Sequence, residues 1–178
     1  MAVEVINGRN VLLFFRERAN HATEDGSKLR FQTEHSISKE KETESTITKD
    51  GNINSITDGE NTADITSLAY VDDEAIITTW ETLEDMFDRN ALVEMWQVDI
   101  TNATPENPNV RPTYFQGYFT SFELSAPADG QVELSYSYAI NGNGVKGDDV
   151  LSEAQLQAVT ASIYEYETIA ATGDQPVE

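Results

Sequence analysis

Polar and apolar residues alternate over residues 35–56 as they do in a β-hairpin, yet this stretch has only four aliphatic side chains, Ile37, Ile47, Ile53 and Ile56. Side chains on a strand point alternately to opposite faces. One face of the first strand is therefore acidic and hydroxylic, and the other carries lysines and isoleucines. The first face holds Ser38, Glu40, Glu42, Glu44, Thr46 and Thr48, and the second holds Ile37, Lys39, Lys41, Thr43, Ser45 and Ile47.

The sequence Lys49-Asp50-Gly51-Asn52 predicts the turn of this hairpin, because glycine supplies a positive φ without strain. Twelve extended residues reach roughly 40 Å. A ribbon of two such strands is marginally stable alone in water. The segment is therefore either a disordered loop or an arm that is ordered by what it contacts. We favour an arm over about residues 35–57.

The rest of the chain predicts many strands and one main helix. Ile77, Trp80, Leu83 and Phe87 recur at helical spacing, and the acids from Asp72 onward suit a helix start, so we expect the main helix over about residues 74–89. Ser152 and Gln155 have the spacing of a capping box before a short helix. Strands are expected at 10–15, 29–33, 63–70, 92–100, 113–124, 131–140 and 163–167; loops at 101–112 and 141–144; and a mobile tail at about 170–178.

These elements indicate an α+β protein, mostly β, close to a sandwich or barrel. The length of 178 residues suits a single domain over 1–178. No apolar run is long enough for a transmembrane helix, and we expect no signal peptide in residues 1–8. The chain has no cysteine, which excludes disulfides and thiol chemistry.

The net charge of −21 is unevenly distributed. Residues 1–50 hold 8 of the 11 basic residues, so the remainder of the chain carries nearly all of the negative excess. Direct nucleic-acid binding is disfavoured, because affinity for phosphate depends on basic patches. The excess is either an ordinary solvated surface or a surface that attracts the more basic part of a neighbour.

No residue pattern predicts catalysis, a cofactor or a metal. The two histidines, His21 and His35, have no partner at metal or triad spacing and are expected at the surface. Nucleophile elbows, phosphate-binding loops and zinc signatures are absent from the sequence. Asp50, Asp58 and the pair Asp148-Asp149 lie near glycines, but their spacing does not fit a calcium loop.

Several strings in fixed order resemble the major tail protein of long, non-contractile-tailed bacteriophages (siphophages). The similarity runs from about Asn10 to Glu167 and departs from the family before and after. Its strings are LRFQTEH (29–35), Lys49-Asp50-Gly51, YFQGYFTSFE (114–123), VELSYSYAINGNGVKG (132–147) and LSEAQ (151–155).

This resemblance implies two packed antiparallel β-sheets flanked by a helix. It also implies hexameric rings stacked into a hollow tail tube. Such a tube surrounds the tape measure protein, ends at tail terminator and tail tip proteins, and passes double-stranded DNA without specific binding. The protein would be assembled in the host cytoplasm and reside in the tail of the virion, with no membrane partner.

If the chain forms such a tube, carboxylates lining the lumen would repel DNA and leave no adhesive site. Glu40, Glu42 and Glu44 share a strand face and are candidates for the lumen, although the same face could instead meet a neighbouring ring. The lysines of the arm are expected to meet acids of an adjacent subunit. The candidate inter-subunit or inter-ring contacts are Lys39, Lys41, Lys49, Asp50, Ile37 and Ile47.

Two other classes of function compete with this one. An acidic β-sandwich binding or adhesion module would need exposed aromatic residues, but Trp80 and Trp96 lie on apolar stripes. A small hydrolase using paired carboxylates has almost no specific support, since 32 acidic residues allow many such pairs.

Overall fold

The computed structural model describes residues 3–73, 75 and 77–160. Helix α1 is Thr79–Asp88 and helix α2 is Glu153–Thr160, with single 3₁₀ turns at Gly8–Asn10 and Arg18–Asn20. The strands are β1 (Val11–Glu17), β2 (Ser27–Lys28), β3 (Gln32–Thr48), β4 (Gly51–Leu68), β5 (Val93–Asp99), β6 (Asn109–Val110), β7 (Thr113–Ser125), β8 (Glu133–Lys146) and β9 (Asp149–Val150).

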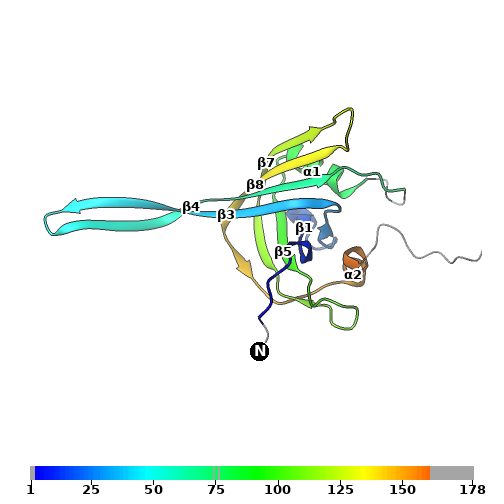
Figure 1. Ribbon diagram of the computed structural model, residues 1–178, viewed down its shortest axis with the longest axis horizontal. Helices are drawn as coiled ribbons and strands as arrows, with labels where there is room; N and C mark the ends of the chain where they lie inside the picture. The colour runs from blue at the N-terminus through cyan, green and yellow to red at the C-terminus, as the bar shows by residue number, and fades with distance from the viewer. Residues whose placement is uncertain (1–2, 74, 76, 161–178) are drawn as a thin grey trace, which may run out of the picture.

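Seven of these strands form one antiparallel sheet in the order β2-β1-β5-β7-β8-β4-β3, and β6 pairs with β9 in a second, two-stranded sheet. The mostly β, α+β class with one main helix and a long hairpin is confirmed. The hairpin of β3 and β4 runs from the body far into solvent, where no other strand accompanies it (Figure 1).

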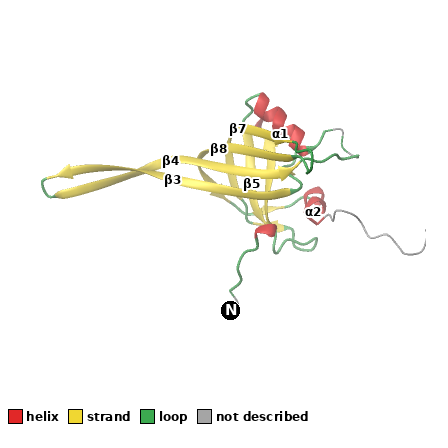
Figure 2. Ribbon diagram, turned by 45° about the horizontal axis from the view of Figure 1, so that its top comes forward, coloured by secondary structure: helices red, strands yellow, loops and turns green. Residues whose placement is uncertain are grey.

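The large sheet curls around the main core, and α1 packs over it (Figure 2). Alternate residues of each strand point inward, such as Leu13 and Phe15 of β1 and Met95 of β5. The long aromatic strand β7 places Phe119 at the centre, where its ring meets those of Phe15, Tyr136 and Tyr138. This alternation is what a sheet with one buried face requires.

A smaller core lies on the opposite face of β1 and β5. Phe14, Val98, Val110 and Leu151 are buried there, and Leu156 of α2 packs against them. Helix α2 begins with the expected capping box, because Ser152 N donates to Gln155 Oε1 (2.9 Å) and Gln155 N donates to Ser152 Oγ (3.3 Å). The two cores explain why β1 and β5 read as continuous apolar runs.

Beside the smaller core, a carboxylate is buried in an ionic cluster. The Glu94 side chain is 1% exposed and accepts hydrogen bonds from Arg16 Nε (2.7 Å), Arg18 Nη1 (2.9 Å) and the Tyr114 hydroxyl (2.5 Å). Burial raises the pKa of Glu94, but these three donors outweigh it and hold that pKa below 4.5. The cluster therefore ties β1, β5 and β7 together as a charged unit.

One side chain joins the two margins of the sheet, which do not pair as strands. The amide of Gln32, at the start of β3, accepts from Leu13 N (3.2 Å) and donates to Leu13 O (3.0 Å) and Leu29 O (2.8 Å). It thus takes the place of a neighbouring strand beside β1. Farther along β3, His35 Nε2 lies 3.1 Å from Gln97 Nε2 of β5, so β3 crosses over the main core.

The structure differs from the sequence prediction at several boundaries. Helix α1 begins at Thr79, after a capping box of Thr78 and Glu81, and not at the acids near residue 74. The strand expected at 63–70 is the end of β4, which is continuous with the arm. The loop expected at 141–144 is part of β8. The predicted strand at 163–167 and tail at 170–178 lie outside the described residues.

Residues 141–144 stay in the strand because β8 forms a bulge there. Tyr114 pairs with Val145 and Gln116 with Asn141, so residues 142–144 all lie opposite Phe115. Gly142 and Gly144 have φ values of 71° and 78°, in the left-handed region that favours glycine. A Cβ at Gly144 would lie 2.4 Å from the Phe115 ring, so the bulge also makes room for that ring.

Replacing Gly117 tests the packing at the centre of the sheet. A Cβ on this residue would lie 1.9 Å from the Ala139 carbonyl oxygen on β8. We expect Gly117→Ala to lower the free energy of unfolding by about 3 kcal/mol, because rigid backbone would have to move. Chemical denaturation measures this change. Gly147→Ala, with no heavy atom within 4 Å of its Cβ, is the control, and equal stability of the two variants would contradict the packing described here.

Candidate assembly surface

The arm, defined here as residues 40–60, is the part of the β3–β4 hairpin that extends beyond the sheet. Strand β4 pairs with β8 only from Asn61 to Leu68, so within the described part of the chain the two arm strands pair only with each other. The turn at Lys49 and Asp50 is closed by the pairing of Thr48 with Gly51, whose φ is 130°. The predicted hairpin is therefore confirmed, while residues 35–39 of the predicted segment belong to the body.

Apolar side chains are exposed on both faces of the arm. Ile53 lies opposite Thr46 on one face, while Ile47 and Ile56 lie on the other. Their exposed fractions are 62% for Ile53, 83% for Ile47 and 66% for Ile56. A two-stranded ribbon cannot bury both of its faces by itself. Exposed apolar residues gathered on so thin a projection are typical of a contact surface.

Glu42 and Glu44 lie on the arm face that also carries Ile53, and Glu40 lies where the arm leaves the body. The even-numbered residues of β3 continue from this face onto the sheet face that points away from the main core. That sheet face is mostly polar and holds acids but no Lys or Arg on β3, β4 and β8. Its residues there are Glu34, Ser36, Ser38, Thr62, Asp64, Thr66, Leu68, Glu133, Ser135, Ser137 and Ala139.

A polar network holds the root of the arm, and it centres on Asn61. This side chain is buried, accepts a hydrogen bond from Glu40 N (3.2 Å), and donates to Gly142 O (2.6 Å) and Asn143 Oδ1 (3.0 Å). Lys39 pairs with Asn61 and Lys41 with Asp58, so Gly59 and Glu60 together lie opposite Glu40 in a bulge. The network thus joins a bulge of β4 to the bulge of β8.

Two of the predicted contact lysines bind groups of their own subunit at this root. Lys39 Nζ donates to Asn143 O (2.6 Å), and its ammonium lies 5.8 Å from the centre of the Phe115 ring. Lys41 forms an ion pair with Asp58, whose other oxygen accepts from Asn143 Nδ2 (3.1 Å). The hydrogen bonds from Lys41 and Asn143 hold the pKa of Asp58 below 3.8. Lys49 and Asp50 lie in the turn at the tip of the arm.

Other residues singled out in the sequence have structural positions. Ile37 is half-buried and packs against the main core. Trp80 Nε1 donates to Tyr70 O (2.9 Å), and Trp96 packs in the smaller core beneath the Arg16 guanidinium, 4.9 Å from its ring. His21 is exposed, but His35 is half-buried rather than at the surface, and its burial lowers its pKa below 6.5.

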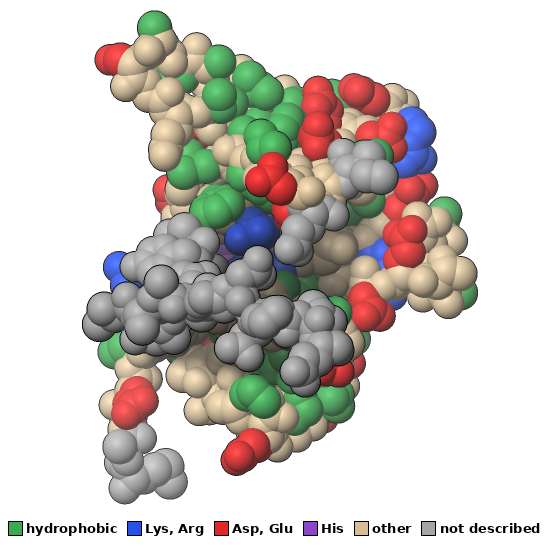
Figure 3. Space-filling model, turned by 90° about the vertical axis from the view of Figure 1, so that its right-hand side faces the viewer, with side chains coloured by type: hydrophobic (Ala, Val, Ile, Leu, Met, Phe, Trp, Pro, Cys, Tyr) green, Lys and Arg blue, Asp and Glu red, His purple; other side chains and the backbone are tan. Residues whose placement is uncertain are grey.

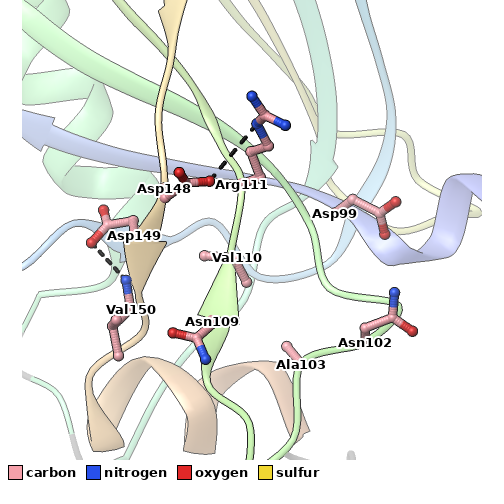
Figure 4. A pocket seen from close by; sticks show the side chains of 9 residues that line it. All are labelled: Asp99, Asn102, Ala103, Asn109, Val110, Arg111, Asp148, Asp149 and Val150. Atoms are coloured by element: carbon pink, nitrogen blue, oxygen red, sulfur yellow. Dashed lines mark hydrogen bonds and ion pairs between the residues drawn. The ribbon is translucent and has the colours of Figure 1, made fainter.

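A polar pocket of about 700 Å³ lies beside β6 and β9 (Figure 4). Asp99, Asp148, Asp149 and Arg111 line it, and Arg111 Nε lies 3.8 Å from Asp148 Oδ1. Within the described residues, no group of three or more His, Asp or Glu side chains could hold a metal ion. In the same residues, no helix has the length and apolar character needed to span a membrane.

Sequence reasoning missed Asn61, which lies between the predicted arm at about 35–57 and the strand expected at 63–70. A signal was present, because Asn61 is in phase with the buried residues Ala63 and Ile65 of the same strand. An amide at an inward-facing position requires hydrogen-bond partners. Two of its three partners, Gly142 O and Asn143 Oδ1, come from the segment 141–144 that was expected to be a loop.

A mostly β body with a long projecting hairpin that exposes apolar side chains is an architecture typical of an assembling structural protein. The model of the family described as phage tail tube protein matches residues 5–146. The chain therefore belongs to the phage tail tube protein family, which confirms the resemblance seen in the sequence. It is a structural component of the virion tail and not an enzyme.

A putative tail protein of Staphylococcus phage phiMR25 is 31% identical over 163 residues, which are 90% of this chain and 81% of that protein. The fold is similar to that of the SPP1 tail tube protein, with a TM-score of 0.67, 17% identity, and 96% of each chain covered. It is also similar to a subunit in the tail of an empty gene transfer agent particle, with a TM-score of 0.56, 12% identity, and coverage of 82% of this chain and 98% of that one.

Asn61→Ala should loosen the arm without unfolding the body. The substitution leaves Glu40 N and Gly142 O without their partner, at a cost of about 2 kcal/mol. We expect faster hydrogen exchange at the amides of residues 40–60 and unchanged exchange in β1 and β5. Asn54→Ala, an exposed change within the arm, is the control. If arm exchange were the same in both variants, the network would not be what holds the root.

The pH dependence of the arm root follows from Asp58. Because its pKa in the folded protein is lowered, the stabilisation it gives is complete above its ordinary pKa of 3.8 and is lost as the pH falls through the lowered value. Carboxyl NMR titration should give a pKa below 3.8, and Lys41→Ala should move it upward. Lys49→Ala is the control and should leave it in place. If the pKa of Asp58 were the same in the wild type and in Lys41→Ala, the ion pair between the two residues would be refuted.

Proposed function

We propose that this protein closes into six-membered rings and that the rings stack into a hollow tube, with each arm gripping a neighbouring copy. The observation that carries this proposal is the arm itself. It exposes Ile47, Ile53 and Ile56, which no described part of the same subunit covers. A similar fold occurs in the gene transfer agent tail, which has six-fold symmetry. Burial of the three isoleucines in an interface would stabilise the assembled state.

The lumen of this tube is proposed to be acidic. The sheet face that carries Glu34, Asp64 and Glu133 continues into the arm face of Glu40, Glu42 and Glu44. Turned toward the tube axis, this surface would present carboxylates and hydroxyls to double-stranded DNA, which carries about one negative charge per 1.7 Å. Like charges repel, so DNA would pass without a binding site. This is the role in DNA delivery that we assign to the acidic excess.

The same charge opposes assembly. Six copies at −21 each repel one another, although charges farther apart than about 8 Å are screened at physiological salt. Ring closure must therefore come from strand pairing and apolar burial, and from the basic residues concentrated in residues 1–50. We expect rings and tubes to be favoured by higher ionic strength.

Membership of the tail tube family supports the partners that we propose for the tube. A tape measure protein would occupy the lumen during assembly in the host cytoplasm, before DNA enters. Tail terminator and tail tip proteins would cover the two ends, since stacked rings leave one arm-bearing end and one arm-free end. Such a stack is heterologous and open, so it needs other proteins to stop it.

Removing the arm beyond its root tests this proposal. The deletion of residues 42–57 with an Asn-Gly turn in their place keeps Lys41 paired with Asp58 and leaves the Asn61 network intact. We expect a folded monomer that forms no tubes under electron microscopy, in conditions where the wild type does. Ser45→Ala with Asn54→Ala, a polar cross-strand pair of the arm, is the control and should assemble. Tubes of normal length from the deletion would refute the role of the arm.

A further inference from the structure

The β3–β4 hairpin has a second surface feature, at the end opposite its tip. Phe31 immediately precedes β3 and Tyr70 follows β4 by one residue, and Leu68 N donates to Phe31 O (3.1 Å). Arg30, Phe31, Tyr70 and Val71 form what we call the receptor cluster. They flank the start of β3 and the end of β4, which is the end of the hairpin opposite the arm tip. Figure 3 views the molecule from the side opposite the arm.

The receptor cluster combines a cation with apolar side chains, is partly exposed, and has one strained residue. Phe31 has a φ of 55°, which is rare for a bulky residue and costs free energy. Its ring meets Tyr70 edge-on at 5.3 Å, and the Arg30 guanidinium lies 5.3 Å from the Phe31 ring and 5.7 Å from the Tyr70 ring. Even so, Phe31 is 38% exposed and Val71 is 91% exposed. A strained aromatic residue held at the surface is typical of a binding site.

The tip of the arm has the chemistry that this cluster would recognise. Ile47 on one face of the tip, or Ile53 on the other, offers apolar surface to Phe31, Tyr70 and Val71. The Arg30 guanidinium forms a long ion pair of 3.7 Å with Asp72 of its own subunit and stays 41% exposed. It can therefore accept a second carboxylate, which Asp50 in the turn offers. No single copy can make this contact with itself, because the 17 residues of β3 separate the two surfaces by roughly 56 Å at about 3.3 Å per residue.

We infer that the receptor cluster of one copy binds the arm tip of a second copy. The inference rests on the proposed function, and it names the surface that the arm grips. Because tip and receptor lie at opposite ends of one hairpin, the contact is head-to-tail and repeats from copy to copy along the strand direction. The contact gives the stack a direction, and it would cover the strained Phe31 side chain.

Cysteine cross-linking tests this contact, since the chain has no cysteine of its own. Lys49→Cys is combined with Val71→Cys in the full chain, assembled and then oxidised. A short bismaleimide is applied in parallel, because a disulfide needs Cα atoms within about 7 Å. Each copy has one tip and one receptor, so denaturing gels without reductant should show a ladder of covalent multimers beyond the dimer. Lys49→Cys with Glu106→Cys, an exposed turn elsewhere on the body, is the matched control and should give no ladder.

The single variants separate this contact from a symmetric one. Lys49→Cys mixed with Val71→Cys should stop at the dimer, and Lys49→Cys alone should stay monomeric on the gel. Dimers from Lys49→Cys alone would show tip-to-tip contact and overturn the inference. If tubes were visible by electron microscopy but no ladder formed, the contact between arm tip and receptor cluster would be refuted. The proposed function would still stand. If the wild type formed neither rings nor tubes at any salt concentration, the proposed function would fail and this inference with it.

Discussion

The arm depends on the hydrogen bonds that Asn61 makes where β4 leaves the sheet. From Asn61 to Leu68, β4 pairs with β8 on one side and β3 on the other. From Gly51 to Glu60, in the arm, it has only β3. A two-stranded ribbon has little stability of its own. Its direction must therefore be fixed at its root, and the Asn61 amide does so by binding Glu40 N on one side and the β8 bulge on the other. The ions around it, Lys39, Lys41 and Asp58, reinforce a geometry that the buried amide sets.

Two bulges, one in β8 and one in β4, lie beside each other at this root. The hydrogen bonds of Asn61 join them. The β8 bulge exists because Gly142 and Gly144 accept positive φ, and it turns the Gly142 and Asn143 oxygens toward Asn61. The β4 bulge brings Gly59 to within reach of the Glu40 backbone, where a Cβ would lie 3.0 Å from the carbonyl oxygen. Bulges of this kind redirect a strand and end its pairing. Strands β3 and β4 thus pass from the sheet of the body into the arm without a break.

The sequence predicted the arm and most strands because alternation and turn chemistry are local signals. It placed the start of α1 too early, because the acids near residue 74 competed with the Thr78–Glu81 capping box that actually begins the helix. It read residues 141–144 as a loop, because two glycines in a strand are ordinarily a break. That such a segment stays paired depends on Phe115 filling the space beside Gly144, a contact that sequence alone does not reveal. The receptor cluster was missed for a similar reason, since the strain at Phe31 arises from the chain path.

The Gln32 amide has a consequence for the mechanics of the body. Three hydrogen bonds from one side chain close the gap beside β1, where a full strand would have made a continuous ladder. The curled sheet therefore has a seam along which it can widen or tighten while every paired strand remains paired. A subunit built in this way can change the curvature of its sheet by breaking three side-chain hydrogen bonds, and no ladder between strands has to open.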